Sequence, residues 1–283
     1  MSPDTFTGKV VIVTGASAGI GRSLALQLAA QGAKLAIAAR RLDRLEQVAQ
    51  ECRAFGSEVV AVQTDVSDEK QCQALVERTV NTFGQLDLLV NNAGLAVSAL
   101  FADFPDLHLF KHTVDINFFG AVYCTYYALP HLKASKGRIL AISSLAGKAP
   151  LPFNTPYVSS KYALNGFLDA LRMELQQTGV SVTIVCPYWV VSEFHQAQLN
   201  KRGVPRGERG RAFYTDKMMT ADQCARISLK AVLKRRREVL MGPGTFAVWL
   251  KLISPALMDW FSVKVFLEPI IRRARQRNRK EST

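Results

Sequence analysis

The chain has 283 residues, of which 48% are apolar and 21% are charged, and its net charge is +13. This composition supports a sizeable buried core and excludes an intrinsically disordered chain. No recognised nucleic-acid-binding motif accompanies the positive charge, so we expect no nucleic-acid partner.

Apolar runs of strand length recur along the chain and alternate with amphipathic helical patterns. This alternation predicts an α/β fold, a single doubly wound Rossmann domain with a mainly parallel, seven-stranded sheet and helices on both faces. We assign residues 1–243 to this domain and treat residues 244–283 as a C-terminal extension. The strands are expected at Val10–Val13, Lys34–Ala39, Val59–Gln63, Leu86–Asn91, Arg138–Ile142, Val180–Cys186 and Glu238–Met241.

A glycine-rich loop, Thr14-Gly15-Ala16-Ser17-Ala18-Gly19-Ile20-Gly21, follows the first predicted strand and precedes an amphipathic helical pattern. Glycines let the backbone approach a pyrophosphate closely, and a helix N-terminus adds free amides and a favourable dipole. The spacing is GxxxGxG, which differs from the commonest dinucleotide fingerprint. The order of strand, loop and helix predicts a dinucleotide site that includes Gly15, Ser17, Gly19, Ile20 and Gly21.

The end of the second predicted strand indicates which nicotinamide cofactor binds. NAD sites usually carry an acidic residue about 20 positions after the glycines, whereas this chain has Arg40 and Arg41 there and no carboxylate before Asp43. Guanidinium groups can hold a 2′-phosphate with charge-assisted hydrogen bonds. We therefore expect NADP(H). The alternative is that Arg41 and Arg44 are solvated residues of the following helix.

Ser144, Tyr157 and Lys161 form a candidate proton-transfer set. Tyr157 and Lys161 are four residues apart in a stretch that is expected to be helical, so their side chains share a face. A neighbouring cation favours the phenolate, and we expect Lys161 to lower the pKa of Tyr157 towards neutrality. Ser144 follows an expected strand, where its hydroxyl can hydrogen-bond a substrate carbonyl oxygen.

These motifs, in this order, resemble those of the short-chain dehydrogenase/reductase family in its single-domain form. The glycine-rich loop and the serine, tyrosine and lysine match the family's cofactor loop and catalytic set. In the segment that matches the family's PGxVxT, Tyr188 replaces glycine and Ser192 replaces threonine, which changes the expected shape of the substrate mouth more than the chemistry.

The resemblance implies further site residues. Asn117 would complete the active site and help to carry protons through water, although it also fits an asparagine that satisfies backbone groups at a helix bend. Asp65 and Val66 would contact adenine. Further cofactor contacts are implied for Asn91, Ala93, Gly94, Pro187, Val190 and Ser192, together with Tyr157 and Lys161.

The function implied by the resemblance is NADP(H)-dependent hydride transfer between the nicotinamide and a carbonyl or secondary alcohol. Tyr157 would act as the acid/base, Ser144 would orient the oxygen, and Lys161 would also hold the nicotinamide ribose. No metal is needed: His108 and His112 are four residues apart but have no evident third ligand. The alternative function is a catalytically silent NADP-binding sensor or scaffold.

The candidate substrate pocket is mostly apolar and aromatic, which favours a lipid-, sterol- or retinoid-like substrate, although part of this set also fits ordinary core. Residues 193–220 contain several glycines and charges, and we expect them to close over substrate. The expected lining residues are Leu95, Leu151, Phe153, Tyr188, Trp189 and Phe194.

The C-terminal extension contains an apolar segment, residues 246–271, which lies between basic runs at 234–237 and 272–280. Charged residues interrupt the apolar segment, so it lacks the ~20 apolar residues of a spanning helix. Three alternatives fit: a cover of the substrate pocket, an interface in a homo-oligomer (a dimer or tetramer), or an anchor at a membrane surface.

Five cysteines are scattered along the chain and form neither a CxxC pair nor a disulfide framework. We expect buried free thiols in a reducing compartment, and hence a cytoplasmic location. The alternative is a cytoplasmic protein that is attached peripherally to a membrane.

Overall fold

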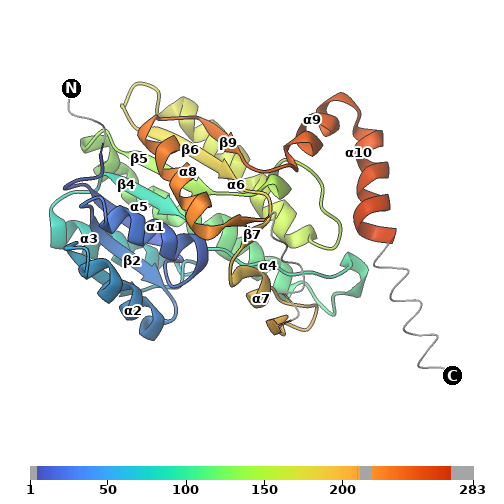
Figure 1. The fold of residues 1–283 in the computed structure, drawn as a ribbon, viewed down its shortest axis with the longest axis horizontal. Coiled ribbons are helices and arrows are strands. Elements are labelled where there is room, and N and C mark those ends of the chain that lie inside the picture. Colours follow the sequence, from blue (N-terminus) through green and yellow to red (C-terminus); the bar gives the residue numbers. More distant parts are fainter. Residues whose placement is uncertain (1–4, 209, 211–217, 269–283) are drawn as a thin grey trace.

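A seven-stranded parallel sheet forms the centre of the molecule in a computed structural model that describes residues 5–208, 210 and 218–268 (Figure 1). The strand order is β3-β2-β1-β4-β5-β6-β9, and each neighbouring pair is parallel. The expected doubly wound α/β fold is therefore confirmed. In such a sheet the order reverses between β1 and β4, and ligands bind beyond the carboxyl ends of the strands at that point.

The strand bounds differ from the expected ones at four ends, because Leu86, Val180 and Met241 are buried without belonging to the strands beside them, whereas Thr14 extends the first strand. The apolar character of these three buried residues therefore reflects their burial and does not show that they pair in a strand. The strands are β1 (Val10–Thr14), β2 (Lys34–Ala39), β3 (Val59–Gln63), β4 (Leu88–Asn91), β5 (Arg138–Ile142), β6 (Ser181–Cys186) and β9 (Glu238–Leu240).

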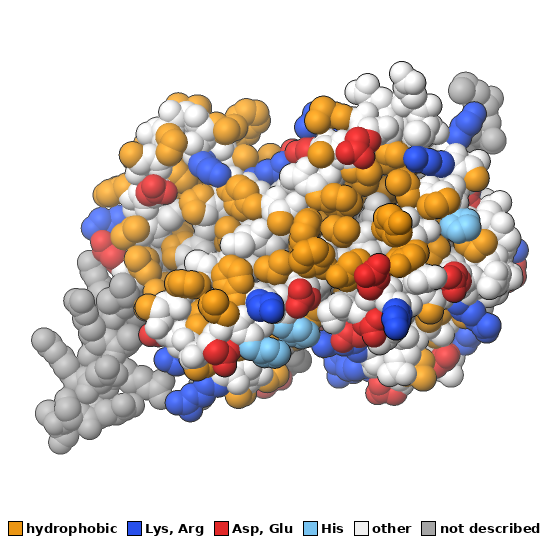
Figure 2. All heavy atoms as spheres, turned by 180° about the vertical axis from the view of Figure 1, so that it is seen from behind, with side chains coloured by type: hydrophobic (Ala, Val, Ile, Leu, Met, Phe, Trp, Pro, Cys, Tyr) orange, Lys and Arg blue, Asp and Glu red, His pale blue; other side chains and the backbone are white. Residues whose placement is uncertain are grey.

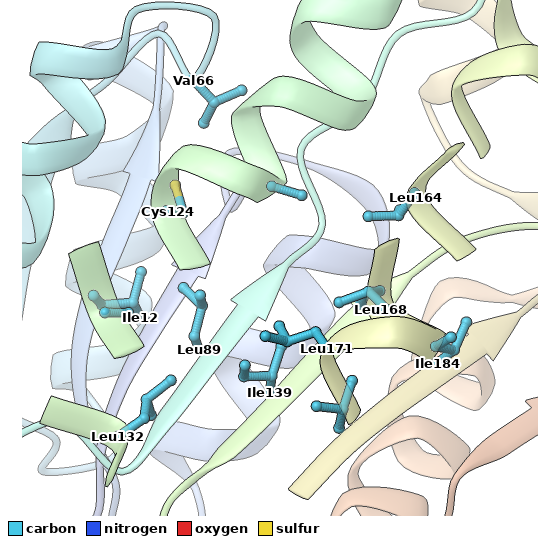
Figure 3. Packing of buried hydrophobic residues seen from close by; sticks show 14 of the residues in the cluster. Ile12, Val66, Leu89, Cys124, Leu132, Ile139, Leu164, Leu168, Leu171 and Ile184 are labelled. Carbon is cyan, nitrogen blue, oxygen red and sulfur yellow. The ribbon is translucent and has the colours of Figure 1, made fainter. Parts of the chain in front are cut away.

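Helices cover both faces of the sheet. One face packs against α1 (Gly19–Ala29), α2 (Leu42–Arg53) and α8 (Ala221–Leu233), and the other against α3 (Glu69–Phe83), α5 (Gly120–Ala134) and α6 (Thr155–Glu174). In Figure 3, Leu164, Leu168 and Leu171 of α6 lie over Ile139 and Ile184 of the sheet. Their spacing of four and three residues puts them on one helical face.

Helix α6 is held against the carboxyl end of the sheet by this apolar face, so the residues in its first two turns lie at the edge where ligands bind.

All five cysteines, Cys52, Cys72, Cys124, Cys186 and Cys224, are buried and free, as expected.

Short elements surround that edge. They are η1 (Phe101–Asp103), α4 (His108–Val114), the π-helical turn η2 (Asp115–Phe119), η3 (Leu145–Gly147), β7 (Val190–Val191), α7 (Phe194–Ala197) and β8 (Met219–Thr220). Strands β7 and β8 form a separate parallel pair that the sequence did not predict, since two residues are too few to show a strand periodicity.

Two helices, α9 (Thr245–Ile253) and α10 (Pro255–Ser262), and the π-helical turn η5 (Val263–Leu267) follow the sheet. They lie at the right-hand end of Figure 1, outside the layers formed by the sheet and its helices. The basic run at 272–280 and the end of the apolar segment lie outside the described residues. Within the described residues, no helix has the length and apolar character needed to cross a bilayer. The division of the chain at residue 243 stays a prediction.

Candidate active site

The loops that follow β1 and β4 are hydrogen-bonded to each other at the switch point. The Thr14 hydroxyl donates to the Val90 carbonyl (3.1 Å) and accepts from the backbone amides of Asn92 (3.0 Å) and Ala93 (3.1 Å). The Asn92 side chain donates to the carbonyls of Thr14 (2.9 Å) and Gly15 (3.2 Å). The glycine-rich loop and the segment Asn91-Asn92-Ala93-Gly94, which we call the NNAG segment, therefore form one unit.

This unit is too tightly packed for a side chain at Gly15 or Gly21. A Cβ atom on Gly15, whose φ is +64°, would lie 2.8 Å from the Ala93 Cα atom, and one on Gly21 would lie 2.2 Å from the Gly15 carbonyl oxygen. A Cβ atom on Gly19 would lie 3.2 Å from the Ser192 Cβ atom, so the end of the PGxVxT-like segment adjoins the loop.

The N-terminus of α1 has the chemistry of an anion site. Its N-cap is Ala18, which provides no side-chain cap, and its first turn holds no acidic residue. The first amides of a helix have no partner within the helix, so they are available to a phosphate group. Ser17 and Ile20 flank this end and are partly exposed. The residues present therefore fit a pyrophosphate.

Ser144, Tyr157 and Lys161 come together at the carboxyl end of β5. Ser144 caps η3, and its Oγ atom accepts from the amide of Ala146 (3.1 Å). The Lys161 Nζ atom lies 5.7 Å from the centre of the Tyr157 ring and donates to the Ile142 carbonyl (2.9 Å). The predicted helical spacing is thus realised in α6.

The pKa of Tyr157 moves in the direction opposite to the one expected from the sequence. Burial raises the pKa of Tyr157 to about 12, although a hydrogen bond with Ser144 acts to lower it. Burial also lowers the pKa of Lys161 to about 8. The expectation that Lys161 brings the phenol towards neutrality is wrong for this structure, because loss of solvation dominates at both groups. At neutral pH Tyr157 therefore keeps its proton.

The buried ammonium makes stability depend on pH. Lys161 has a pKa of about 8 when folded and an ordinary value of 10.5. Between these values the unfolded chain binds a proton that the folded chain lacks, so the free energy of unfolding rises with pH. We expect the stability of Lys161→Met relative to the parent to fall by about 2–3 kcal/mol between pH 7 and pH 10. Urea denaturation of both proteins measures this difference, and an unchanged difference would contradict the prediction.

Asn117 lies in the π-helical turn η2, between α4 and α5. Its side chain donates to the Leu95 carbonyl (2.8 Å) and the Ser160 hydroxyl (2.9 Å) and accepts from the Leu95 amide (2.7 Å). The alternative reading, an asparagine that satisfies backbone groups at a helix bend, describes these contacts. π-Helical turns often occur at functional sites.

A cavity of about 10 Å³ lies beside this asparagine, and Asn91, Asn117 and Lys161 are among its lining residues. The Oδ1 atom of Asn91 is buried and has no hydrogen-bond partner within the described part of the chain. A space of this size with several polar groups is suited to one water molecule.

Arg40 and Arg41 follow β2 with exposed side chains, and Arg41 is the N-cap of α2. Arg44 differs, because its Nη1 atom is 2.6 Å from Glu193 Oε2. Arg44 is thus a partly solvated residue of α2, as the alternative described it, and it also forms an ion pair at the surface.

The remaining cofactor candidates lie around the same edge. The Asp65 carboxylate accepts from the amide (3.0 Å) and hydroxyl (2.7 Å) of Ser67, and a Cβ atom on Gly120 would be 2.7 Å from the Val66 side chain. The Pro187 carbonyl accepts from the Leu145 amide (3.0 Å), which joins the segment 187–192 to η3. Val190 is buried in β7, and a Cβ atom on Gly94 would be 3.9 Å from Lys161 Nζ.

Two of the aromatic substrate-pocket candidates face different neighbours. The Phe194 ring centre is 5.8 Å from that of Tyr157, as a lining residue would be. The Tyr188 ring instead packs on the turn before α9, where a Cβ atom on Gly244 would lie 2.5 Å from it. Leu151 and Phe153 are half-buried before α6, and Leu95 is held by Asn117. Whether these line a pocket stays a prediction.

His195 was missed by the sequence reasoning. Its ring stacks on Trp189 with centres 5.1 Å apart, and burial lowers the pKa of His195. The only signal was its place next to Phe194.

His108 and His112 stack with centres 6.0 Å apart, and the described residues contain no group of three metal-ligating side chains.

The chain is similar to known oxidoreductases over most of its length. Residues 9–203 match the family model described as short chain dehydrogenase. A Sesamum indicum protein named 11-beta-hydroxysteroid dehydrogenase A is 38% identical over 259 residues, which are 89% of this chain and 74% of that protein.

Two solved structures have the same fold. A Thermococcus sibiricus alcohol dehydrogenase complexed with 5-hydroxy-NADP has a TM-score of 0.71 and 27% identity, over 82% of this chain and 95% of that one. A Burkholderia phymatum short chain dehydrogenase/reductase in complex with NAD has a TM-score of 0.79 and 26% identity, over 89% of this chain and 96% of that one.

Proposed function

The chain belongs to the short-chain dehydrogenase/reductase family, and we propose that it is an NADP(H)-dependent oxidoreductase that acts on a carbonyl or secondary alcohol of an apolar substrate. The observation that carries the proposal is the meeting of Ser144, Tyr157 and Lys161 beside a glycine-rich loop that fits a pyrophosphate. A bound nicotinamide supplies or accepts the hydride at the substrate carbon.

The protein's own residues supply the proton and the orientation. Tyr157 keeps its proton at neutral pH and donates it to the substrate oxygen. The Tyr157 hydroxyl is thus the acid that carbonyl reduction requires. Ser144, already hydrogen-bonded with Tyr157, aligns the same oxygen. Lys161 keeps a positive charge beside the ring, since its pKa of about 8 leaves it mostly protonated at pH 7.

Proton resupply is proposed to run through the small cavity beside Asn117. Its polar lining joins Asn117 and Lys161, and one water there would connect the catalytic lysine to the interior of the turn η2. Asn117 acts here by holding Leu95 and Ser160 in place, so it is a positioning residue in this scheme.

The preference for NADP(H) is proposed from Arg40 and Arg41. The solved relatives hold either 5-hydroxy-NADP or NAD, so they do not favour one cofactor, and the proposal is based on these two residues. We expect Arg40→Ala and Arg41→Ala to raise the KM for NADPH about tenfold or more and to leave that for NADH nearly unchanged.

Arg44→Ala is the matched control for this experiment, because Arg44 is near in sequence but is paired with Glu193. Steady-state kinetics with both cofactors measure the effect. Equal changes for NADPH and NADH in the Arg40 and Arg41 variants would remove the assignment.

An apolar substrate is proposed from Phe194, whose ring lies 5.8 Å from that of Tyr157, and from the sesame relative, whose name specifies a hydroxysteroid. The function is tested by following NADPH oxidation with apolar ketones, including steroids, against aldehydes and 3-oxoacyl compounds. Turnover of apolar ketones supports the proposal. Binding of NADPH without turnover of any compound would favour the silent sensor instead.

A cytoplasmic location, a homo-oligomer and closure of residues 193–220 over substrate stay predictions.

A further inference from the structure

Helices α9 and α10 pack with a narrow inner face and leave a wide apolar outer face. Val248 and Met258 are buried and belong to the same core cluster as Leu164 and Leu168 of α6. The outer residues are 39–82% exposed, and they are Phe246, Trp249, Leu252, Ile253, Leu257, Trp260, Val263 and Val265. We call these eight residues the outer apolar face.

The outer apolar face is continuous along the helices. Residues 246, 249 and 253 recur every three or four positions in α9, and residues 257, 260 and 263 do so through α10 into η5. Figure 2 shows hydrophobic side chains over this end of the molecule, at the left. Amphipathic helices of a globular protein bury their apolar stripe, so an exposed stripe of this size indicates an interaction surface.

Helix α9, which carries part of the outer apolar face, contacts residues close in sequence to the catalytic ones. The Lys251 Nζ atom donates to the Tyr162 hydroxyl (2.5 Å), and Tyr162 follows Lys161 in α6. Lys251 also reaches the Lys148 carbonyl (3.4 Å), four residues after Ser144. At the start of α9, Tyr188 fills the space beside Gly244. A partner on the outer apolar face therefore lies next to the catalytic end of the sheet.

We propose that the outer apolar face docks on the surface of an anionic lipid bilayer. Residues 244–283 contain eight lysines and arginines against three acidic residues, and six of the eight lie within 272–280. Two copies of a chain with a net charge of +13 repel each other, whereas anionic lipid attracts basic segments. Two tryptophans on an apolar face that cannot span the bilayer suit the boundary between headgroups and acyl chains.

Docking would place the active-site end beside a lipid phase in which apolar ketones dissolve. That consequence rests on the proposed function, but the docking does not. Vesicle binding and NADPH turnover are separate measurements, so the failure of one leaves the other standing.

The test is flotation of the purified full chain with phosphatidylcholine vesicles, with and without about one-quarter phosphatidylserine. We expect flotation to be strong only with phosphatidylserine and to weaken when salt is added. Trp249→Glu and Trp260→Glu should each weaken partition about tenfold or more. Phe55→Glu is the matched control, because Phe55 is 58% exposed after α2, against 62% for Trp249, and it should float like the parent.

Replacing the six basic residues of 272–280 by glutamine should remove the dependence on phosphatidylserine. Circular dichroism and NADPH binding check that each variant is folded. The proposal is overturned if the parent does not float, or if Phe55→Glu weakens flotation as much as Trp249→Glu. It is also overturned if light scattering shows that Trp249→Glu dissociates an oligomer while vesicle partition is unchanged, since the occupant would then be a second copy.

Discussion

Tyr157→Phe is expected to lose about 10²-fold or more in turnover while it still binds NADPH. The substitution keeps the ring that packs on Phe194 and removes the hydroxyl whose proton the reaction needs. The proposed cofactor site lies mainly in the loops after β1 and β4, so NADPH binding should change little. Stopped-flow turnover and NADPH fluorescence titration measure the two quantities.

Tyr162→Phe is the matched control for this loss. Tyr162 lies five residues further along the same helix, and its hydroxyl binds Lys251 rather than Ser144. It should keep turnover within about threefold of the parent, because it touches no reacting atom. Near-parent turnover in Tyr157→Phe would end the proposed mechanism, whatever cofactor is used.

Gly21→Ala is expected to abolish measurable NADPH binding and to lower the thermal midpoint. The new methyl group would lie 2.2 Å from the Gly15 carbonyl oxygen and 2.5 Å from Asn92 Nδ2. The Gly15 oxygen is a backbone atom, and the Asn92 side chain is held in place by its hydrogen bonds to the Thr14 and Gly15 carbonyls. Calorimetric titration of the folded fraction with NADPH measures the loss.

Gly166→Ala provides the comparison, because Gly166 is also helical but a Cβ atom there meets nothing within 4 Å. Alanine has the higher helix propensity, so this variant should bind NADPH like the parent and gain about 0.5–1 kcal/mol of stability. If Gly21→Ala binds NADPH as tightly as Gly166→Ala does, the loop after β1 does not hold the pyrophosphate.

The positions of most strands could be predicted from the sequence because each is a local apolar run with turn residues at its ends. Lys34–Ala39, Val59–Gln63 and Arg138–Ile142 were predicted to the residue. The candidate site could be located because its residues follow such strands, and parallel strands bring their carboxyl ends to one edge. Ser144 follows β5, and Tyr157, thirteen positions later, meets it there from the first turn of α6.

Only the tertiary structure decided the direction of the Tyr157 pKa shift and which apolar side chains of α9 and α10 are exposed. The pKa of Tyr157 depends on every group that removes water from around it, so the nearby Lys161 could not fix its direction. The hydrogen bonds from Asn92 to the glycine-rich loop cross 77 and 78 positions of sequence.

The outward direction of Trp249 and Trp260 was equally undetermined, because an apolar helix in a sequence fits a core, an interface or a lipid surface. The sequence predicts which segments form strands and helices, because each strand or helix pattern lies within a short stretch of the chain. Burial is a property of all neighbours together, and those neighbours are known only once the chain has packed.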